Sequence, residues 1–138
     1  MDNTFSNSFA KSLLTGFVDK NIDSDIVWRP QLLTNKLIPK EKVLSTLLSE
    51  FDTCDEFFIS VAFVTTSGIA VLLNSLLSLE RKGIKGKVLV SQYLNFTEPE
   101  ALKKLKLFEN IELRISTKGN THSKGYIFKK TDYYNLIV

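Results

Sequence analysis

The chain has one cysteine, one histidine and one tryptophan in 138 residues, and these scarcities limit what the protein can be. A single cysteine, Cys54, excludes an intrachain disulfide and favours a protein of the reducing cytoplasm. Its surroundings, FDTCDEFF, are acidic and raise the pKa of a thiol, so we expect a structural residue rather than a nucleophile. No apolar run approaches the roughly 20 residues that cross a bilayer, and the first residues lack the features of a signal peptide. We therefore expect no membrane partner.

Linkers, repeats and nucleotide-binding loops are also absent. No Pro- or Gly-rich stretch is long enough to divide the chain, and nothing recurs at the spacing of a solenoid. The stretch Gly83-Ile84-Lys85-Gly86 lacks the spacing of a phosphate-binding loop and follows a helical pattern rather than a strand. We expect one domain, residues 1–138, in which 1–27 form a loosely attached segment.

The sequence does contain an alternation of helical and strand-like patterns. Helices are predicted over 39–51 with Pro39 in the first turn, over 65–83, and over 97–108 with Thr97 and Glu100 as a capping box. Strands are predicted over 56–64, 86–92, 111–116, 122–128 and 133–138. The first is a nearly continuous apolar run, typical of a strand buried on both faces, and the second is also predicted to be buried. The alternation predicts an α/β fold: a mostly parallel mixed sheet with helices on both faces and two C-terminal hairpin strands.

Charge is distributed unevenly along the chain. Residues 1–80 hold 6 Lys/Arg against 10 Asp/Glu, a net charge of −4, whereas residues 81–138 hold 12 against 5, a net charge of +7. A basic half suits an anionic partner such as a nucleic-acid backbone. The alternative is that lysines such as Lys103, Lys104 and Lys106 form the solvated face of a helix.

The stretch THSKGYIF contains the only histidine, His122, two residues before Lys124. Residues two apart in a strand project from one face, about 7 Å from each other, so the imidazole and the ammonium would point together. Such a pair suits a phosphoryl group, because the lysine neutralises it while the neutral imidazole attacks phosphorus. An exposed strand on which both side chains are merely solvated is the alternative, and spacing alone leaves it open.

This stretch resembles the phospholipase D superfamily, whose signature is His-x-Lys on a strand. Segments 54–72, 86–105 and 110–115 are similar to the phospholipase D-like domain at the N-terminus of bacterial DEAD/DEAH-type helicases. Those helicases are related to the helicase subunits of type III restriction systems. The similarity extends from about Trp28 onward and implies a phospholipase D-like fold and a nuclease domain attached to a DNA helicase.

The resemblance also implies a mechanism and partners. In this superfamily two His-x-Lys motifs face each other: one histidine attacks phosphorus, the other protonates the leaving oxygen, and no metal or cofactor takes part. This chain has one motif, which implies a homodimer acting on nucleic acid, DNA above all, with His122 and Lys124 as catalytic residues. The family's Gly-Ser-x-Asn segment would follow Val138, so we expect the N-terminal fragment of a longer protein whose missing part holds the ATP-binding helicase motor.

The superfamily motif places Asp five residues after the lysine, where this chain has Lys129; Asp132 lies nearby but off the spacing. That departure weakens the prediction of a lipid hydrolase more than the prediction of a nuclease. Ser60 and Gln92, in and at the end of two predicted strands, are candidates for substrate binding, with structural polar roles as the alternative. Two further functions stay open: a nucleic-acid-binding module without turnover, and a dimerisation domain for the helicase.

Overall fold

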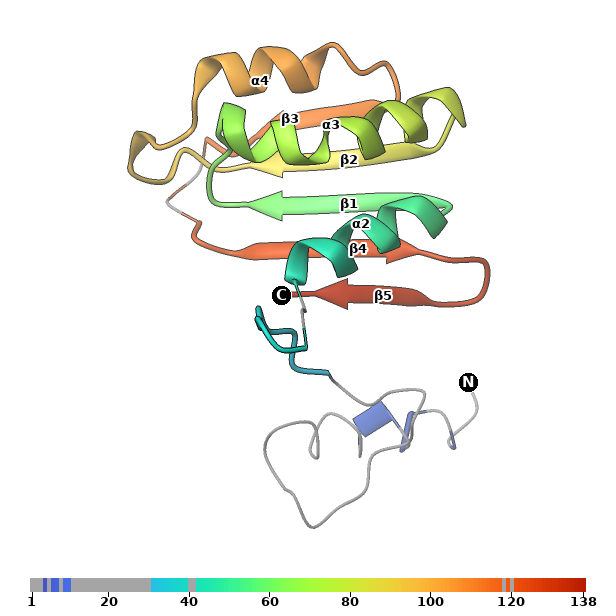
Figure 1. The fold of residues 1–138 in the computed structure, drawn as a ribbon. Coiled ribbons are helices and arrows are strands. Elements are labelled where there is room, and N and C mark those ends of the chain that lie inside the picture. Colours follow the sequence, from blue (N-terminus) through green and yellow to red (C-terminus); the bar gives the residue numbers. More distant parts are fainter. Residues whose placement is uncertain are drawn as a thin grey trace. The chain divides into compact units, whose positions relative to one another are not determined.

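A computed structural model describes residues 4, 6–7, 9–10, 31–39, 42–117, 119 and 121–138 (Figure 1). The chain divides into two compact units, Met1–Val43 and Leu44–Val138. The predicted N-terminal segment, 1–27, lies largely outside the described residues. All of the predicted strands belong to the second unit.

The second unit is built on one five-stranded sheet in the order β3-β2-β1-β4-β5. Its strands are β1 (Glu56–Val61), β2 (Lys85–Val90), β3 (Ile111–Ile115), β4 (Lys124–Lys129) and β5 (Tyr134–Ile137). The β1–β2 and β2–β3 pairings are parallel, whereas β4 runs antiparallel to both β1 and β5. The predicted mixed α/β sheet and its C-terminal hairpin are therefore confirmed.

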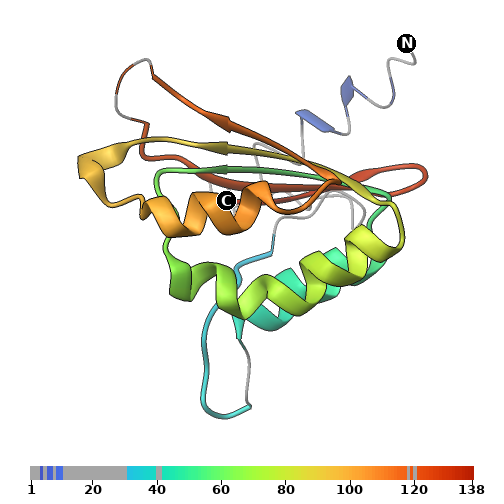
Figure 2. The same cartoon turned by 90° about the horizontal axis from the view of Figure 1, so that it is seen from above.

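Three helices, α2 (Val43–Thr53), α3 (Thr66–Arg81) and α4 (Pro99–Lys106), pack on the same face of this sheet (Figure 2). The prediction of helices on both faces is wrong for the part of the chain that the structure describes. Burial alternates along β2, where Val88 and Val90 are buried and Leu89 between them is exposed. The apolar residues of β2 therefore do not indicate a strand covered on both faces, because every second side chain points away from the helices.

The boundaries of the helices reflect local and tertiary partners. The α3 helix begins as predicted, with the Thr65 hydroxyl accepting a hydrogen bond from the Gly68 amide at 3.1 Å. The predicted first turn at Pro39 is wrong, because α2 begins only at Val43. The capping box is also wrong: the Thr97 hydroxyl donates to the Ser91 carbonyl instead of capping α4.

The core lies between the sheet and the helices and is centred on three fully buried aromatic rings. Phe51 of α2 packs edge-to-face against Phe57 of β1 and Phe128 of β4, with ring centroids 5.4 and 5.0 Å apart. Gly86 lies beneath the Phe57 ring, where a Cβ atom would come within 2.0 Å of Cζ. These contacts join α2 to the middle of the sheet.

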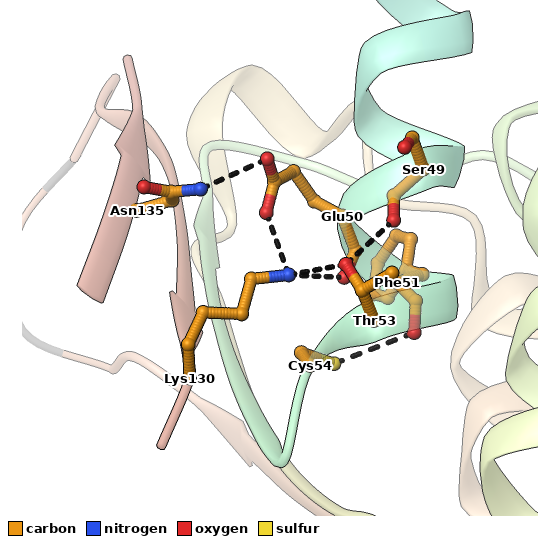
Figure 3. Close-up of polar contacts among 7 residues, drawn as sticks. All are labelled: Ser49, Glu50, Phe51, Thr53, Cys54, Lys130 and Asn135. Atoms are coloured by element: carbon orange, nitrogen blue, oxygen red, sulfur yellow. Dashed lines mark hydrogen bonds and ion pairs between the residues drawn. The ribbon is translucent and has the colours of Figure 1, made fainter. Parts of the chain in front are cut away.

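A nearly buried lysine ties α2 to the β4–β5 hairpin (Figure 3). Lys130 Nζ lies 2.9 Å from Glu50 Oε2, donates to the Glu50 carbonyl at 3.2 Å, and donates to the Thr53 hydroxyl. The Asn135 amide donates to the other Glu50 oxygen at 2.9 Å, and the Thr53 hydroxyl donates to the Ser49 carbonyl. The ammonium is thus neutralised and hydrogen-bonded, as burial of a charge requires.

Candidate functional site

The carboxyl ends of β1, β2 and β3 meet the start of β4 at one edge of the sheet (Figure 1). Ser91, at the end of β2, is 3% exposed and connects the segments that gather there. Its amide donates to the Val61 carbonyl at 3.0 Å, and its hydroxyl accepts from the Thr121 amide at 3.3 Å. Its carbonyl accepts from the Thr97 hydroxyl at 2.9 Å. Ser91 therefore fixes the segment just before His122 against the central strands.

His122 and Lys124 both lie exposed at this edge. The predicted strand 122–128 begins later than expected: Lys124 is the first residue of β4, and His122 lies in the segment leading into it. The imidazole packs against Tyr93, with ring centroids 4.5 Å apart and an interplanar angle of 49°. His122 is therefore supported on one side by an aromatic ring and still accessible to a ligand.

Lys124 also borders an apolar cavity of about 260 Å³ between the sheet and α3. Its walls include Ile59 and Val61 of β1, Ile69 of α3, and Tyr126, which follows Lys124 by two residues on β4. Burial raises the pKa of the Tyr126 phenol, so this group is neutral at ordinary pH. An apolar wall next to an ammonium reduces solvent screening and strengthens its attraction for an anion.

The amino end of α3 faces the same edge but already has an anionic partner. Glu98 Oε2 accepts a hydrogen bond from the Thr66 amide at 2.7 Å. Hydrogen bonding to the Thr66 side chain, and then to the Thr66 amide, lowers the pKa of the exposed Glu98 carboxyl. The Glu98 amide in turn donates to the Val64 carbonyl at 2.9 Å. Glu98 thereby holds the loop before α4 against the end of β1.

The other predicted site residues are not all brought together. Gln92 is exposed and begins the turn that carries Tyr93, so it lies at the same edge as His122. Ser60 pairs with Gly125 across β1 and β4 and lines the face of the sheet opposite to α2, α3 and α4. The structure therefore separates Ser60 from Lys124, whose side chain borders the cavity on the helix side.

Lys129, at the position of the superfamily's Asp, lies at the far end of β4 and pairs with Glu56 at 3.9 Å. Asp132 is exposed in the turn between β4 and β5, also at the far edge. Cys54 is buried, and that burial is the main cause of its raised pKa, ahead of its acidic neighbours. The thiol is thus the poor nucleophile that its surroundings in the sequence predicted.

Sequence reasoning missed Tyr93 and Ser91. The signal available was their position: Ser91 follows directly on β2 and Tyr93 comes two residues later, at the ligand-binding edge of an α/β sheet. A scan against protein-family models and a search of curated proteins gave no match to this chain. Among the described residues, no helix combines the length and the apolar character needed to cross a membrane.

Proposed function

We propose that this chain is a phospholipase D-like phosphodiesterase domain that cleaves nucleic-acid phosphodiesters through a phosphohistidine intermediate. The observation that carries the proposal is an exposed imidazole and an exposed ammonium two residues apart, at the edge where three strand ends meet. The chain's resemblance to the phospholipase D-like domain of restriction-type DNA helicases supports the choice of substrate. In the parent protein, ATP hydrolysis belongs to a helicase motor outside this chain.

The proposed reaction has two displacements at phosphorus. The neutral His122 imidazole attacks, a P–N bond forms, and the bond to the leaving ester oxygen breaks while a second histidine gives that oxygen its proton. Water then attacks the phosphohistidine and loses a proton to the second histidine; a P–O bond forms, the P–N bond breaks, and a phosphomonoester and the free His122 imidazole are released. Lys124 neutralises the nonbridging oxygens throughout.

Cleavage by this route is expected to survive removal of divalent metal ions. The histidines supply both the nucleophile and the proton, so no step needs a Lewis acid. We expect equal initial rates of cleavage of a labelled single-stranded oligonucleotide in EDTA and in Mg²⁺. Activity that disappears in EDTA and returns with Mg²⁺ would contradict the proposal.

The second histidine is expected to come from a second copy of the chain. His122 is the only histidine, and a two-fold dimer with both His122 residues near the axis supplies the second motif. Size-exclusion chromatography with light scattering should give twice the mass of one chain. A mass that stays at one chain up to the highest workable concentration would rule out this arrangement.

A nucleic-acid-binding function without turnover is the second candidate. It is favoured by Lys129, since a lysine paired with Glu56 at the far end of β4 stands where the superfamily motif has its Asp. Such a module would bind DNA in a salt-sensitive way, target the helicase, and keep its affinity after His122→Ala.

A further inference from the structure

Four aromatic rings form a continuous row that starts at the imidazole of the proposed site. Tyr93 contacts both His122 and Phe96, with ring centroids 4.5 and 6.4 Å apart. Phe96 contacts Phe63 edge-to-face at 5.6 Å. The core rings of Phe51, Phe57 and Phe128 are fully buried, whereas Phe96 is 53% exposed. The row therefore presents an exposed ring, Phe96, near the site, and its far member, Phe63, is half-buried against the apolar cavity.

The turn that carries these rings is held in an unfavourable backbone conformation. Leu94 and Asn95 have φ angles of 48° and 58°, in the left-handed region, which costs a leucine about 1–2 kcal/mol. The Leu94 side chain is also 58% exposed. Backbone strain of this kind persists only where the surrounding structure enforces it, and it is concentrated at ligand sites.

The ends of the turn show how the strain is maintained. Ser91, just before it, is fixed by hydrogen bonds to Val61 and Thr121. Just after it, the Thr97 hydroxyl bonds to the Ser91 carbonyl, and the Glu98 amide bonds to Val64. The rings are therefore presented on a rigid support, which a binding surface requires and a solvent loop does not.

We infer that Tyr93 and Phe96 form a stacking site for an unpaired base of a single-stranded nucleic acid. This rests on the proposed function, in which a phosphodiester lies at His122 and Lys124. The group attached to that phosphate must extend over neighbouring surface, and the row of rings begins at the imidazole itself. Bases stack on aromatic side chains irrespective of sequence, and bases inside a duplex have both faces already covered.

Binding to the full chain can be measured by fluorescence anisotropy with three labelled probes: a short oligothymidylate, an abasic strand of equal length, and a duplex. We expect the oligothymidylate to bind roughly tenfold or more tightly than the other two, from stacking of about 1–3 kcal/mol per base. Phe96→Leu keeps an apolar side chain but removes the ring, and Tyr93→Ala removes the other ring. Each should abolish most of that preference.

Tyr134→Ala is the matched control, because Tyr134 is an exposed tyrosine on β5 at the far edge of the sheet. The affinity of the Tyr134→Ala variant for all three probes should equal that of the unaltered chain. Equal affinity for the three probes, or an unchanged preference in both Phe96→Leu and Tyr93→Ala, would overturn the stacking site. Unfolding midpoints of the variants confirm that they are folded.

A cleavage assay distinguishes a failure of the stacking site from a failure of the proposed phosphodiesterase. If the abasic strand is cut in EDTA while the ring variants bind normally, the stacking site fails and the phosphodiesterase stands. If ring-dependent binding of oligothymidylate occurs without cleavage, the stacking site stands and turnover fails.

Discussion

Replacing His122 with alanine is expected to reduce metal-independent phosphodiester cleavage at least about a thousandfold, the scale seen when a nucleophile is removed. In a two-fold dimer the same substitution changes both subunits, so it removes both the nucleophile and the proton donor. Initial rates at equal protein concentration measure the loss. Because His122 is exposed and precedes β4, we expect the unfolding midpoint to stay unchanged.

Two neighbours make the His122 experiment specific. Ser123→Ala changes an exposed residue between the pair and should cleave at the rate of the unaltered chain. Lys124→Ala should lose about a hundredfold, since it removes charge stabilisation but keeps the nucleophile. A fall of less than tenfold in His122→Ala would mean that another group attacks phosphorus, or that the observed cleavage comes from a contaminant.

Replacing Lys130 with alanine is expected to lower the free energy of unfolding by about 3 kcal/mol, near the lower end of what broken buried ion pairs cost. The Lys130 and Glu50 side chains are only 9% and 19% exposed, so the substitution leaves a carboxylate largely removed from water with Asn135 as its remaining partner. It also removes the contacts of Lys130 with Glu50 and Thr53 of α2, so the Asn135 bond is left to join α2 to the β4–β5 hairpin (Figure 3). Guanidinium unfolding followed by circular dichroism measures the change.

An exposed pair of the same type provides the comparison. Lys103 and Glu100 on α4 are 70% and 67% exposed, so Lys103→Ala should hardly shift the midpoint. The double replacement Glu50→Leu with Lys130→Met should recover part of the loss, because it leaves no unpaired charge. If Lys130→Ala shifts the midpoint no further than Lys103→Ala, the buried pair contributes nothing to stability.

Much of the fold was predictable because local signals and tertiary structure agree. The α3 helix has its capping threonine at Thr65 and its terminating glycine at Gly83, where φ is +70°. The covering of the sheet was not predictable, since Leu89 and Ile127 are apolar yet lie on its exposed face. Apolar residues on both faces of a strand fit a doubly covered sheet and a one-sided sheet equally well.

The site was only partly predictable for a similar reason. The spacing of His122 and Lys124 is visible in the sequence, and a strand, β4, does begin at Lys124. The contact between Tyr93 and His122 joins two distant segments, and no local pattern reports such a pairing. Thr97 is a further example. The sequence predicts that its hydroxyl caps a helix by accepting from a helix amide, but in the structure the hydroxyl donates to the Ser91 carbonyl.

The antiparallel course of β4 and β5 has a practical consequence for anyone preparing this protein. Ile137 pairs with Tyr126, so Val138 ends next to Gly125, one residue from Lys124. A polyhistidine affinity tag fused after Val138 would place additional imidazoles close to His122, the histidine whose role is being tested. Purification handles for the His122 comparison should therefore be cleavable or chemically different.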